Sequence, residues 1–301
     1  MVSSLLGLAA LLFAAAQSPS PAMVGQWEKV FDGGPNDWVY AVAAVGRDDW
    51  FIALAGGVAK VTKGNVERYA TAPRQVEGLL VASPSSVYAF GDGELVVHHD
   101  GQQWTTEHVG PPPPRPRRRG TGAPDMLQEG YFSDATLVAF GPSLVTVKQP
   151  DGSWGYPPKD ERQKLWDAGG SGPQIVKPPK CDLAGWRWLG KDRGFFYCHD
   201  RRAFVWSAGG LTPKGKIPRP CDDALNATVE EAGELYVACN AATLWKTKGD
   251  GAWQAIQPPR EKGLREILFM AGAGGCLFVA GPRSVWRSCH GWPAAPVTKT
   301  Q

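Results

Sequence analysis

The sequence predicts an all-β fold, a single β-propeller of about six four-stranded blades. Apolar runs of strand length recur in groups of four, and the groups repeat about every 40 residues, the period of a propeller blade. Turn residues separate the runs, and no stretch shows the 3.6-residue apolar period of a long helix. The 37 Gly, 26 Pro and 13 Trp among 301 residues suit many short strands joined by tight turns.

The expected strands form six groups in chain order. The first three groups comprise 38–45, 49–54, 58–62 and 65–69; then 76–83, 86–90, 94–98 and 103–108; then 126–133, 136–140, 144–148 and 153–156. The last three comprise 186–189, 194–198, 203–206 and 211–216; then 224–231, 234–239, 243–246 and 252–256; then 264–271, 276–280, 284–287 and 292–297. One four-stranded sheet cannot bury both of its faces, so the groups must stack around an axis.

Closure of the ring depends on the two ends of the chain. Pro293 and Pro296 disfavour a paired strand at 292–297, because proline cannot donate a ladder hydrogen bond. We therefore expect the isolated run 26–31 to supply the outermost strand of the last blade. A ring of seven blades is the alternative, with part of a degenerate blade hidden in 159–179.

Two inserts interrupt the period. Insert 111–124, PPPPRPRRRGTGAP, is polyproline-like and carries four arginines, Arg115, Arg117, Arg118 and Arg119. Because guanidinium groups match carboxylate and phosphate oxygens, the insert could dock an anionic partner such as an acidic glycan; the alternative is a solvated linker. Insert 157–180 mixes charged residues with Gly and Pro, and we expect a surface excursion with one helical turn.

The N-terminus is typical of a secretory signal. Residues 5–16 are apolar and end in three alanines, and the stretch is too short to span a bilayer. We expect a signal peptide at 1–22 and a propeller domain at 23–301, in a secreted or periplasmic protein. The first four residues lack Lys and Arg, so an uncleaved hydrophobic N-terminus is the alternative. No later run is long enough to be a transmembrane segment.

Six cysteines, all in the second half of the chain, favour the same compartment. The fourth and fifth groups align so that Cys181 corresponds to Cys221 and Cys198 to Cys239, with spacings of 17 and 18 residues. A third expected hairpin places two further cysteines opposite each other. Disulfides are therefore predicted for the pairs Cys181 and Cys198, Cys221 and Cys239, and Cys276 and Cys289. Metal ligation and free thiols are the alternatives.

Three turns share an Asp-Gly step followed by Trp: HHDGQQW at 98–104, PDGSW at 150–154 and GDGAW at 249–253. They resemble the aspartate-box turns of BNR and sialidase-type propellers, although the Ser or Thr two residues before the Asp is absent at Asp100 and Asp151. The resemblance implies structural roles: Asp accepts backbone N–H groups, Gly takes a positive φ and Trp packs between sheets. These turn residues are Asp100, Gly101, Trp104, Asp151, Gly152, Trp154, Asp250, Gly251 and Trp253.

Function is less specified than fold. With 32 basic and 29 acidic residues, the net charge of +3 does not indicate nucleic acid as a partner. No linear motif indicates a catalytic residue, a metal site or a cofactor, and of His98 and His99 we expect one packed and one exposed side chain. The sequence therefore favours a monomeric, non-catalytic binding or scaffold propeller for a protein or anionic glycan partner. The alternative is a sialidase-like glycan hydrolase, which would need three convergent arginines, a Tyr activated by Glu and an acidic proton donor.

Overall fold

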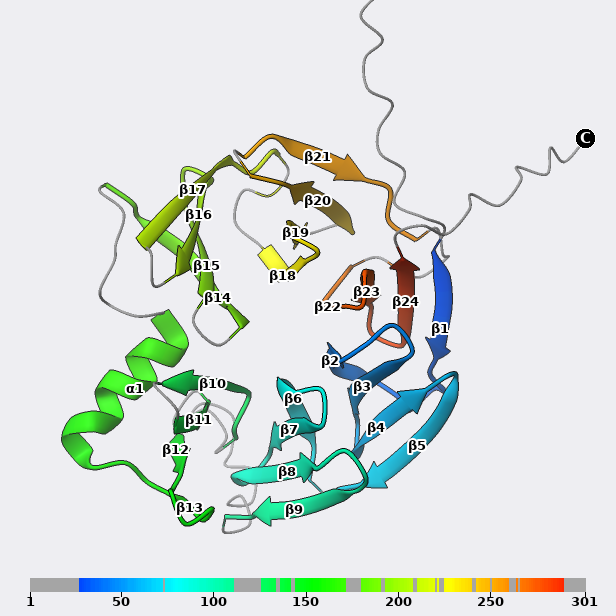
Figure 1. The fold of residues 1–301 in the computed structure, drawn as a ribbon, viewed down its shortest axis with the longest axis vertical. Coiled ribbons are helices and arrows are strands. Elements are labelled where there is room, and N and C mark those ends of the chain that lie inside the picture. Colours follow the sequence, from blue (N-terminus) through cyan, green and yellow to red (C-terminus); the bar gives the residue numbers. More distant parts are fainter. Residues whose placement is uncertain are drawn as a thin grey trace, which may run out of the picture.

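A computed structural model describes most of the chain. The described residues are 27–72, 74–110, 126–133, 136–141, 144–171, 180–190, 193–207, 210–219, 221, 225–239, 242–249, 251–259, 264 and 266–289. They form six four-stranded antiparallel sheets in a ring, each sheet a blade (Figure 1). The prediction of a six-bladed propeller is confirmed, and the seven-bladed alternative is wrong.

In blades 1 to 5 the strands run outward from the axis in chain order, and in blade 6 the first strand of the chain takes the outermost place. Blade 1 comprises β2 (Val39–Ala44), β3 (Asp49–Leu54), β4 (Gly57–Thr62) and β5 (Asn65–Ala70). Blade 2 comprises β6 (Val76–Ser83), β7 (Ser86–Gly91), β8 (Leu95–His99) and β9 (Trp104–His108). Blade 3 comprises β10 (Glu129–Ser133), β11 (Thr136–Phe140), β12 (Val145–Lys148) and β13 (Trp154–Gly155).

The second half of the ring repeats this order. Blade 4 comprises β14 (Leu183–Gly190), β15 (Arg193–Cys198), β16 (Arg202–Ser207) and β17 (Gly210–Lys216). Blade 5 comprises β18 (Leu225–Glu231), β19 (Glu234–Cys239), β20 (Thr243–Thr247) and β21 (Trp253–Ile256). Blade 6 comprises β22 (Phe269–Ala273), β23 (Cys276–Ala280), β24 (Ser284–Cys289) and β1 (Glu28–Asp32).

The N-terminal strand closes the ring. β1 pairs antiparallel with β24, with Lys29 opposite Trp286 and Phe31 opposite Val285. The two strands lie side by side on the right of Figure 1. This confirms the expectation that the run 26–31 supplies the outermost strand of the last blade, while 292–297 lies outside the described residues. Because β1 pairs with β24, blade 6 has four strands like the other five blades, and the ring is closed.

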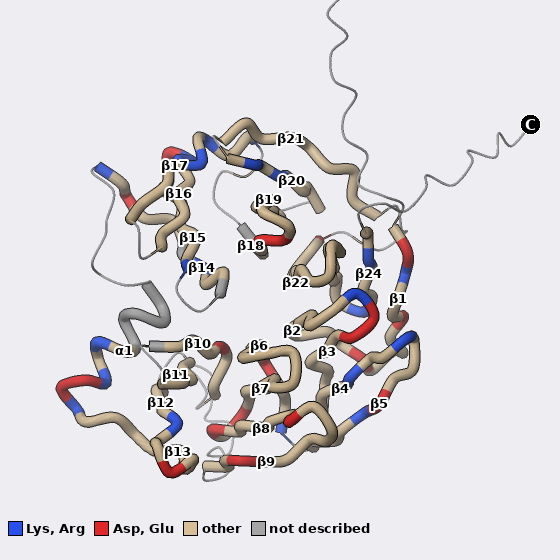
Figure 2. Tube along the Cα trace, viewed as in Figure 1, with Lys and Arg blue, Asp and Glu red and all other residues tan. Residues whose placement is uncertain are grey.

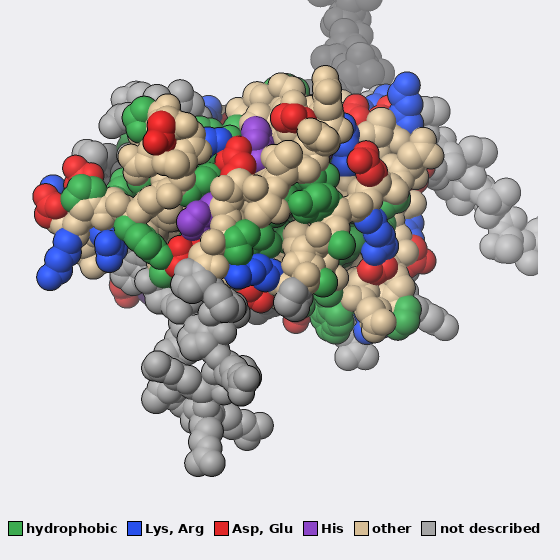
Figure 3. Space-filling view, turned by 90° about the horizontal axis from the view of Figure 1, so that it is seen from below, with side chains coloured by type: hydrophobic (Ala, Val, Ile, Leu, Met, Phe, Trp, Pro, Cys, Tyr) green, Lys and Arg blue, Asp and Glu red, His purple; other side chains and the backbone are tan. Residues whose placement is uncertain are grey.

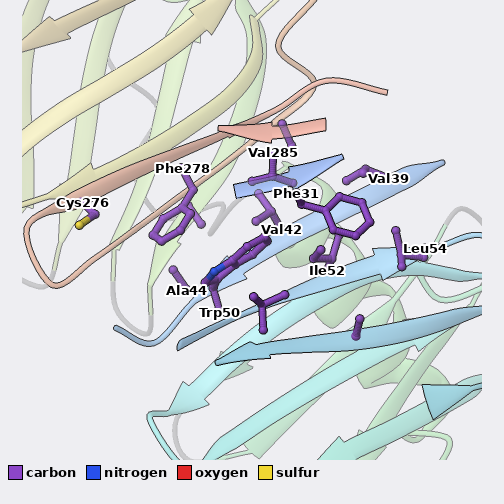
Figure 4. Close-up of a cluster of buried hydrophobic side chains, with 14 of the residues drawn as sticks. Phe31, Val39, Val42, Ala44, Trp50, Ile52, Leu54, Cys276, Phe278 and Val285 are labelled. Atoms are coloured by element: carbon purple, nitrogen blue, oxygen red, sulfur yellow. The ribbon is translucent and has the colours of Figure 1, made fainter. Parts of the chain in front are cut away.

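The second strand of each blade is apolar on both faces, because each blade is covered by two neighbours. In β3, Trp50 and Ile52 pack toward blade 6, whereas Phe51 packs toward blade 2. Figure 4 shows the first of these clusters, in which the Trp50 and Phe278 rings lie 5.5 Å apart and Phe31 of β1 joins them. Packing between blades, rather than within one, therefore forms the core.

One helix interrupts the β-structure of the described residues. Helix α1 (Lys159–Ser171) lies against β10 to β12 of blade 3 on the side that faces blade 4, and it has 13 residues, more than the single turn expected for insert 157–180. It begins after two prolines and has acidic Asp160 and Glu161 in its first turn, which favour a helix N-terminus. Leu165 anchors it against the core of blade 3. No helix among the described residues is long and apolar enough to cross a membrane.

Three disulfides link the predicted cysteine pairs. Cys181 is bonded to Cys198 and Cys221 to Cys239, each joining the segment before an inner strand to the end of the following strand. Cys276 and Cys289 are bonded across the ladder between β23 and β24. All three lie in blades 4 to 6, and the described residues contain no free cysteine.

Candidate functional site

The axis of the ring contains a cavity lined by described residues. Its volume is about 780 Å³, and its wall is built by the innermost strands of all six blades, β2, β6, β10, β14, β18 and β22, with residues just before β10 and β22. The charged residues of the inner strands are Glu77 in β6, Glu129 in β10, Arg187 in β14, and Glu230 and Glu231 in β18 (Figure 2). The first three of these line the cavity.

A β-bulge places polar side chains in the cavity wall. The register of the inner strand shifts near its start in blades 1, 2, 4 and 5, where one extra residue stands opposite the second strand. In β6 this residue is Glu77, and in β18 it is Asn226. Because a bulge turns a side chain out of the regular alternation, both residues line the cavity instead of the core between blades.

The two carboxyl groups of the wall have raised pKa values. Burial raises the pKa of Glu77, opposed by a hydrogen bond from the Gln75 side-chain amide and reinforced by the nearby charge of Asp92. Desolvation by the protein atoms around the cavity also raises the pKa of Glu129, although its side chain is exposed on the cavity wall, and the charge of Arg187 opposes this shift. Ionisation of either carboxyl group therefore costs more free energy than it does in water.

A close backbone contact joins the strands that carry these carboxyl groups. A Cβ atom on Gly78 would lie 1.7 Å from the carbonyl oxygen of Gln128, so no other residue fits where β6 meets the segment before β10. Gly78 follows Glu77, and Gln128 precedes Glu129. The missing side chain thus brings two acidic positions to the same part of the wall.

The rest of the wall mixes unpaired polar atoms with apolar side chains. Nδ2 of Asn226 and Oγ1 of Thr228 are shielded from solvent and have no hydrogen-bond partner in the structure. Leu79, Phe269 and Met270 supply apolar surface. Cavities of this kind, apolar with a few placed polar groups, are typical of ligand sites.

The cavity does not match the sialidase-like alternative in its described residues. Tyr131 lines it, but its hydroxyl donates to the Leu165 carbonyl oxygen at 2.6 Å, and burial raises its pKa. Its ring stacks on Trp188 with 5.0 Å between centroids. Arg187 is the arginine of the described lining, where a sialidase-like site would need three.

A second polar group has the connectivity of a Ser-His-Glu triad. The Ser86 hydroxyl lies 2.8 Å from Nε2 of His98, and Nδ1 of His98 lies 2.9 Å from Oε1 of Glu107. Because the Glu107 carboxylate can only accept, Nδ1 of His98 carries a proton, and Nε2 is the atom that faces the serine hydroxyl. The Tyr88 ring stacks on the imidazole at 4.3 Å.

The contacts around this group indicate that it stabilises the packing of blade 2 against blade 3. Lys148 Nζ of blade 3 donates to both Glu107 oxygens at 2.9 Å, and Trp154 Nε1 donates to Oε2 at 2.9 Å. In blade 5, the residues corresponding to Ser86 and His98 are Glu234 and Lys246, which form an ion pair at 2.9 Å. The same cross-strand position is therefore filled by different polar pairs in different blades, as a structural repeat requires.

The two adjacent histidines face opposite sides of blade 2. His99 is buried and contacts Phe51 and Trp104 edge-on, whereas His98 is half-buried in the group with Glu107. The expectation that one histidine is exposed is wrong, because the neighbouring blade covers the outer strands as well. Figure 3 shows histidine side chains beside acidic ones on the edge of the ring, where both signs of charge are interspersed.

The Asp-Gly turns have the contacts of structural turns. Oδ1 of Asp100 accepts the backbone N–H groups of Gln102 and Gln103 at 2.9 Å, and Gly101 has a φ of +97°. Asp151 accepts the Ser153 N–H in the same way, Gly152 and Gly251 have positive φ, and Trp104 and Trp154 are buried. Trp253 donates from Nε1 to the Lys214 carbonyl oxygen at 2.8 Å, and Asp250 lies outside the described residues.

The four arginines of insert 111–124 also lie outside the described residues, but both ends of the insert are fixed. Gly110 N–H donates to the Gly93 carbonyl oxygen at 3.0 Å, and Leu127 N–H donates to that of Gly91 at 3.1 Å. The insert therefore starts and ends beside the turn between β7 and β8. We call this end of the ring, where the inner strands begin, the entrance end.

Sequence reasoning did not identify the cavity residues Glu77, Glu129, Arg187 and Asn226. A signal for two of them is present, because a charged residue inside an otherwise apolar inner strand, as in VEGLLV and QEGYF, needs a polar environment. Which face of the strand such a residue occupies depends on the bulge, and this cannot be deduced from a single sequence.

Comparisons with known proteins support the fold. No protein-family model and no curated protein matches the sequence. Virginiamycin B lyase from Staphylococcus aureus is similar in structure, with a TM-score of 0.55 and 13% identity over 88% of this chain and 99% of that chain. The WD40 β-propeller domain of Doa1 has a TM-score of 0.56 and 11% identity over 88% of this chain and 97% of that one.

YCF48, in a structure bound to a D1 peptide, has a TM-score of 0.51 and 13% identity over 90% of this chain and 97% of that chain. The chain described by this sequence is therefore itself a β-propeller. At these identities the similarity shows the fold alone, and function has to be argued from the site.

Proposed function

We propose that this protein is an exported, non-catalytic binding propeller that recognises a protein or anionic glycan partner at the entrance end of the ring. The observation that carries the proposal is the axial cavity, whose wall reaches the entrance end through Glu77, Gln128 and Leu268. The ring provides a rigid frame, and the loops at its entrance end are free to vary. Propellers commonly bind partners at the loops and channel of one end.

Two further features support the binding of a partner at the entrance end. Trp38, just before β2, is 46% exposed, and the Arg283 guanidinium lies 5.3 Å from its ring centroid. Exposed Trp and Arg side chains are the residue types most often found at binding hot spots. Gly110 and Leu127, which flank the insert with the four arginines, lie at this same end.

Export is supported by the apolar segment 5–16 and by three disulfides, a bond that persists in oxidising compartments. The proposal places the mature N-terminus near residue 23. Mass spectrometry of the intact protein recovered from the envelope or medium measures this, and a mass that includes the first 22 residues would contradict it.

The insert arginines are the proposed contacts to the anionic groups of the partner. We expect the variant with Arg115, Arg117, Arg118 and Arg119 all changed to Ala to lose most binding, because each Arg contributes a charge-assisted contact. A pull-down from the native envelope fraction and a glycan array, run in parallel, distinguish a protein partner from a glycan.

A matched control changes four exposed cations away from the entrance end, Lys63, Lys164, Arg193 and Lys248, to Ala. Binding that is equal in both quadruple variants would show that the insert is a linker. Absence of any ligand in both assays would contradict the proposed function itself.

A further inference from the structure

Trp38 is an exposed aromatic side chain at a position that is polar in the equivalent blades. In blades 1, 2 and 4, the residue after the second strand donates its backbone N–H to the residue just before the inner strand. These acceptor residues are Trp38, Gln75 and Asp182. The repeat therefore accepts a polar side chain there, and the packing of the ring does not require an indole that is 46% exposed. Apolar surface that the fold does not need indicates a contact outside the chain.

The loop that carries Trp38 is fixed to the adjoining blade. The backbone N–H of Val39 donates to the Pro282 carbonyl oxygen of blade 6 at 2.8 Å, and that of Gly33 donates to the Arg283 carbonyl oxygen at 2.8 Å. A Cβ atom on Gly33 would lie 2.9 Å from that second oxygen, so this close approach requires glycine. Because a side chain on a fixed loop loses little conformational entropy on binding, Trp38 is suited to anchor a partner.

Arg283 places a guanidinium group beside the indole without a carboxylate of its own. The group lies 5.3 Å from the Trp38 ring centroid, and among the described residues no ion pair or side-chain hydrogen bond reaches it. The side chain is exposed, so an anion can reach it without displacing protein atoms. The planar fork of a guanidinium matches the two oxygens of a carboxylate. An apolar surface and an available cation thus stand next to each other.

The acidic groups around this pair are already balanced by other cations. Two nitrogens of Arg68 donate to the two carboxylate oxygens of Asp37 at 2.8 and 2.9 Å. These hydrogen bonds lower the pKa of Asp37 to about 2, so the carboxylate is charged and paired at neutral pH. Asp32, at the end of β1, lies 3.2 Å from Lys29. The charge of Arg283 therefore remains available for a carboxylate from outside the chain.

Most of the large hydrophobic side chains left exposed stand at the same end of the ring. Among the described residues these side chains are Trp38, Val66, Val109 and Tyr156. Trp38 precedes β2, Val109 follows β9 and Tyr156 follows β13, so these three lie at the entrance end of blades 1, 2 and 3. Val66 lies near the opposite end of β5. Exposed apolar groups on three consecutive blades suit the apolar side chains of a protein better than the hydroxyl groups of a glycan.

We propose that Trp38 and Arg283 anchor an acidic segment of a protein partner. An apolar side chain of the segment packs on the exposed part of the indole, and a neighbouring Asp or Glu carboxylate binds the guanidinium. Trp and Arg are residue types that carry much of the free energy of protein–protein binding. The proposal rests on the proposed function and deepens it, because it names a protein as the partner and the seam between blades 6 and 1 as the anchor.

Peptide selection on the mature chain tests the proposal. A phage library of random peptides is first depleted on the double variant Trp38→Ala with Arg283→Ala and is then selected on the wild type. We expect the enriched peptides to carry Asp or Glu close to a large apolar residue. No enrichment on the wild type, or enriched peptides without an acidic residue, would overturn the proposal.

Isothermal titration calorimetry with an enriched peptide measures each anchor. Trp38→Ala should weaken binding by about thirtyfold and Arg283→Ala by about tenfold, as for other hot-spot residues. Val66→Ala and Lys248→Ala, which change an exposed apolar residue and an exposed cation away from the entrance end, are the matched controls and should leave the affinity unchanged. Unchanged affinity in both anchor variants would contradict the assignment.

A charge exchange tests the contact to Arg283 even where Trp38→Ala fails to fold. Arg283→Glu should abolish binding of the acidic peptide, and it should restore binding of the same peptide with its acidic residue changed to Lys. Failure of the exchanged pair to bind better than either mismatched pair would show that the carboxylate does not bind at Arg283.

The assays of the proposed function separate the two proposals. A partner that depends on the insert arginines, but binds equally to the Trp38→Ala and Arg283→Ala variants, would remove this anchor and leave the proposed function standing. A glycan whose binding is lost in Trp38→Ala would show that the partner is not a protein. Absence of any ligand in the pull-down, the glycan array and the peptide selection would contradict both proposals.

Discussion

At the scale of single residues, the polar contacts between blades 2 and 3 show that a group with the order of a catalytic triad can serve blade packing alone. Ser86, His98 and Glu107 have the order of a catalytic triad, yet the charge of Glu107 is already balanced by Lys148. A repeat fold creates such arrangements easily, because the same cross-strand position recurs in every blade. Residues that occur in one blade only, such as Glu77 in its bulge, are therefore better candidates for function.

Glu107 tests this assignment. Burial raises its pKa, but hydrogen bonds from Lys148 and Trp154 outweigh burial, so the pKa is lowered overall. A lowered folded-state pKa contributes stability above the unfolded value of about 4.3, and this contribution is lost as the pH falls below it. We expect Glu107→Gln to reduce the free energy of unfolding at pH 7 by about 1–3 kcal/mol, since Lys148 loses its partner.

Urea unfolding at pH 7 and pH 4 measures both effects. The wild type should lose more stability on acidification than Glu107→Gln does, and Glu67→Gln should behave as the wild type. A Glu107→Gln variant as stable as the wild type at pH 7 would show that the ion pair with Lys148 does not contribute to the free energy of unfolding.

At the scale of elements, the pattern of the sequence predicts the strands well and their local irregularities poorly. The second strands, such as SVYAFG and ELYVAC, are apolar on both faces, and the structure places them between two covering blades. Helix α1 was underestimated because its sequence, KDERQKLWDAGGS, has few apolar residues and ends in two glycines before Ser171. Its support is tertiary, through Leu165 and the hydroxyl of Tyr131, which no local pattern encodes.

The closing strand β1 makes the clearest prediction at this scale. Phe31 is 7% exposed and belongs to the cluster between blades 6 and 1, so Phe31→Ala should cost about 3–5 kcal/mol of unfolding free energy. Val66→Ala, on the exposed outer strand of blade 1, is the matched control and should change stability by less than about 0.5 kcal/mol. Thermal and denaturant unfolding of the two variants measures the difference. Equal stability of both variants would show that β1 is dispensable for closure.

At the scale of the whole molecule, the covalent links divide the ring into two halves. Blades 4, 5 and 6 each contain one disulfide, whereas the segment that forms blades 1 to 3 contains no cysteine. The sequence repeats predicted both the blade number and these pairings, since they depend on strand order alone. The axial cavity was not predictable in the same way, because its wall needs one strand from each of six blades in their three-dimensional register.

The unequal distribution of disulfides predicts an unequal response to reduction. Each bond closes a loop of 13 to 18 residues, which in the chain-entropy model contributes about 3 kcal/mol. Reduction removes this constraint from blades 4 to 6 alone. Hydrogen exchange followed by mass spectrometry, with and without reductant, should therefore show faster amide exchange in β14 to β24 and a smaller change in β2 to β13. Because β1 ties blade 6 to blade 1, any acceleration should reach β2 to β5 before β6 to β13. Equal acceleration of exchange in all six blades would show instead that the ring opens as one cooperative unit.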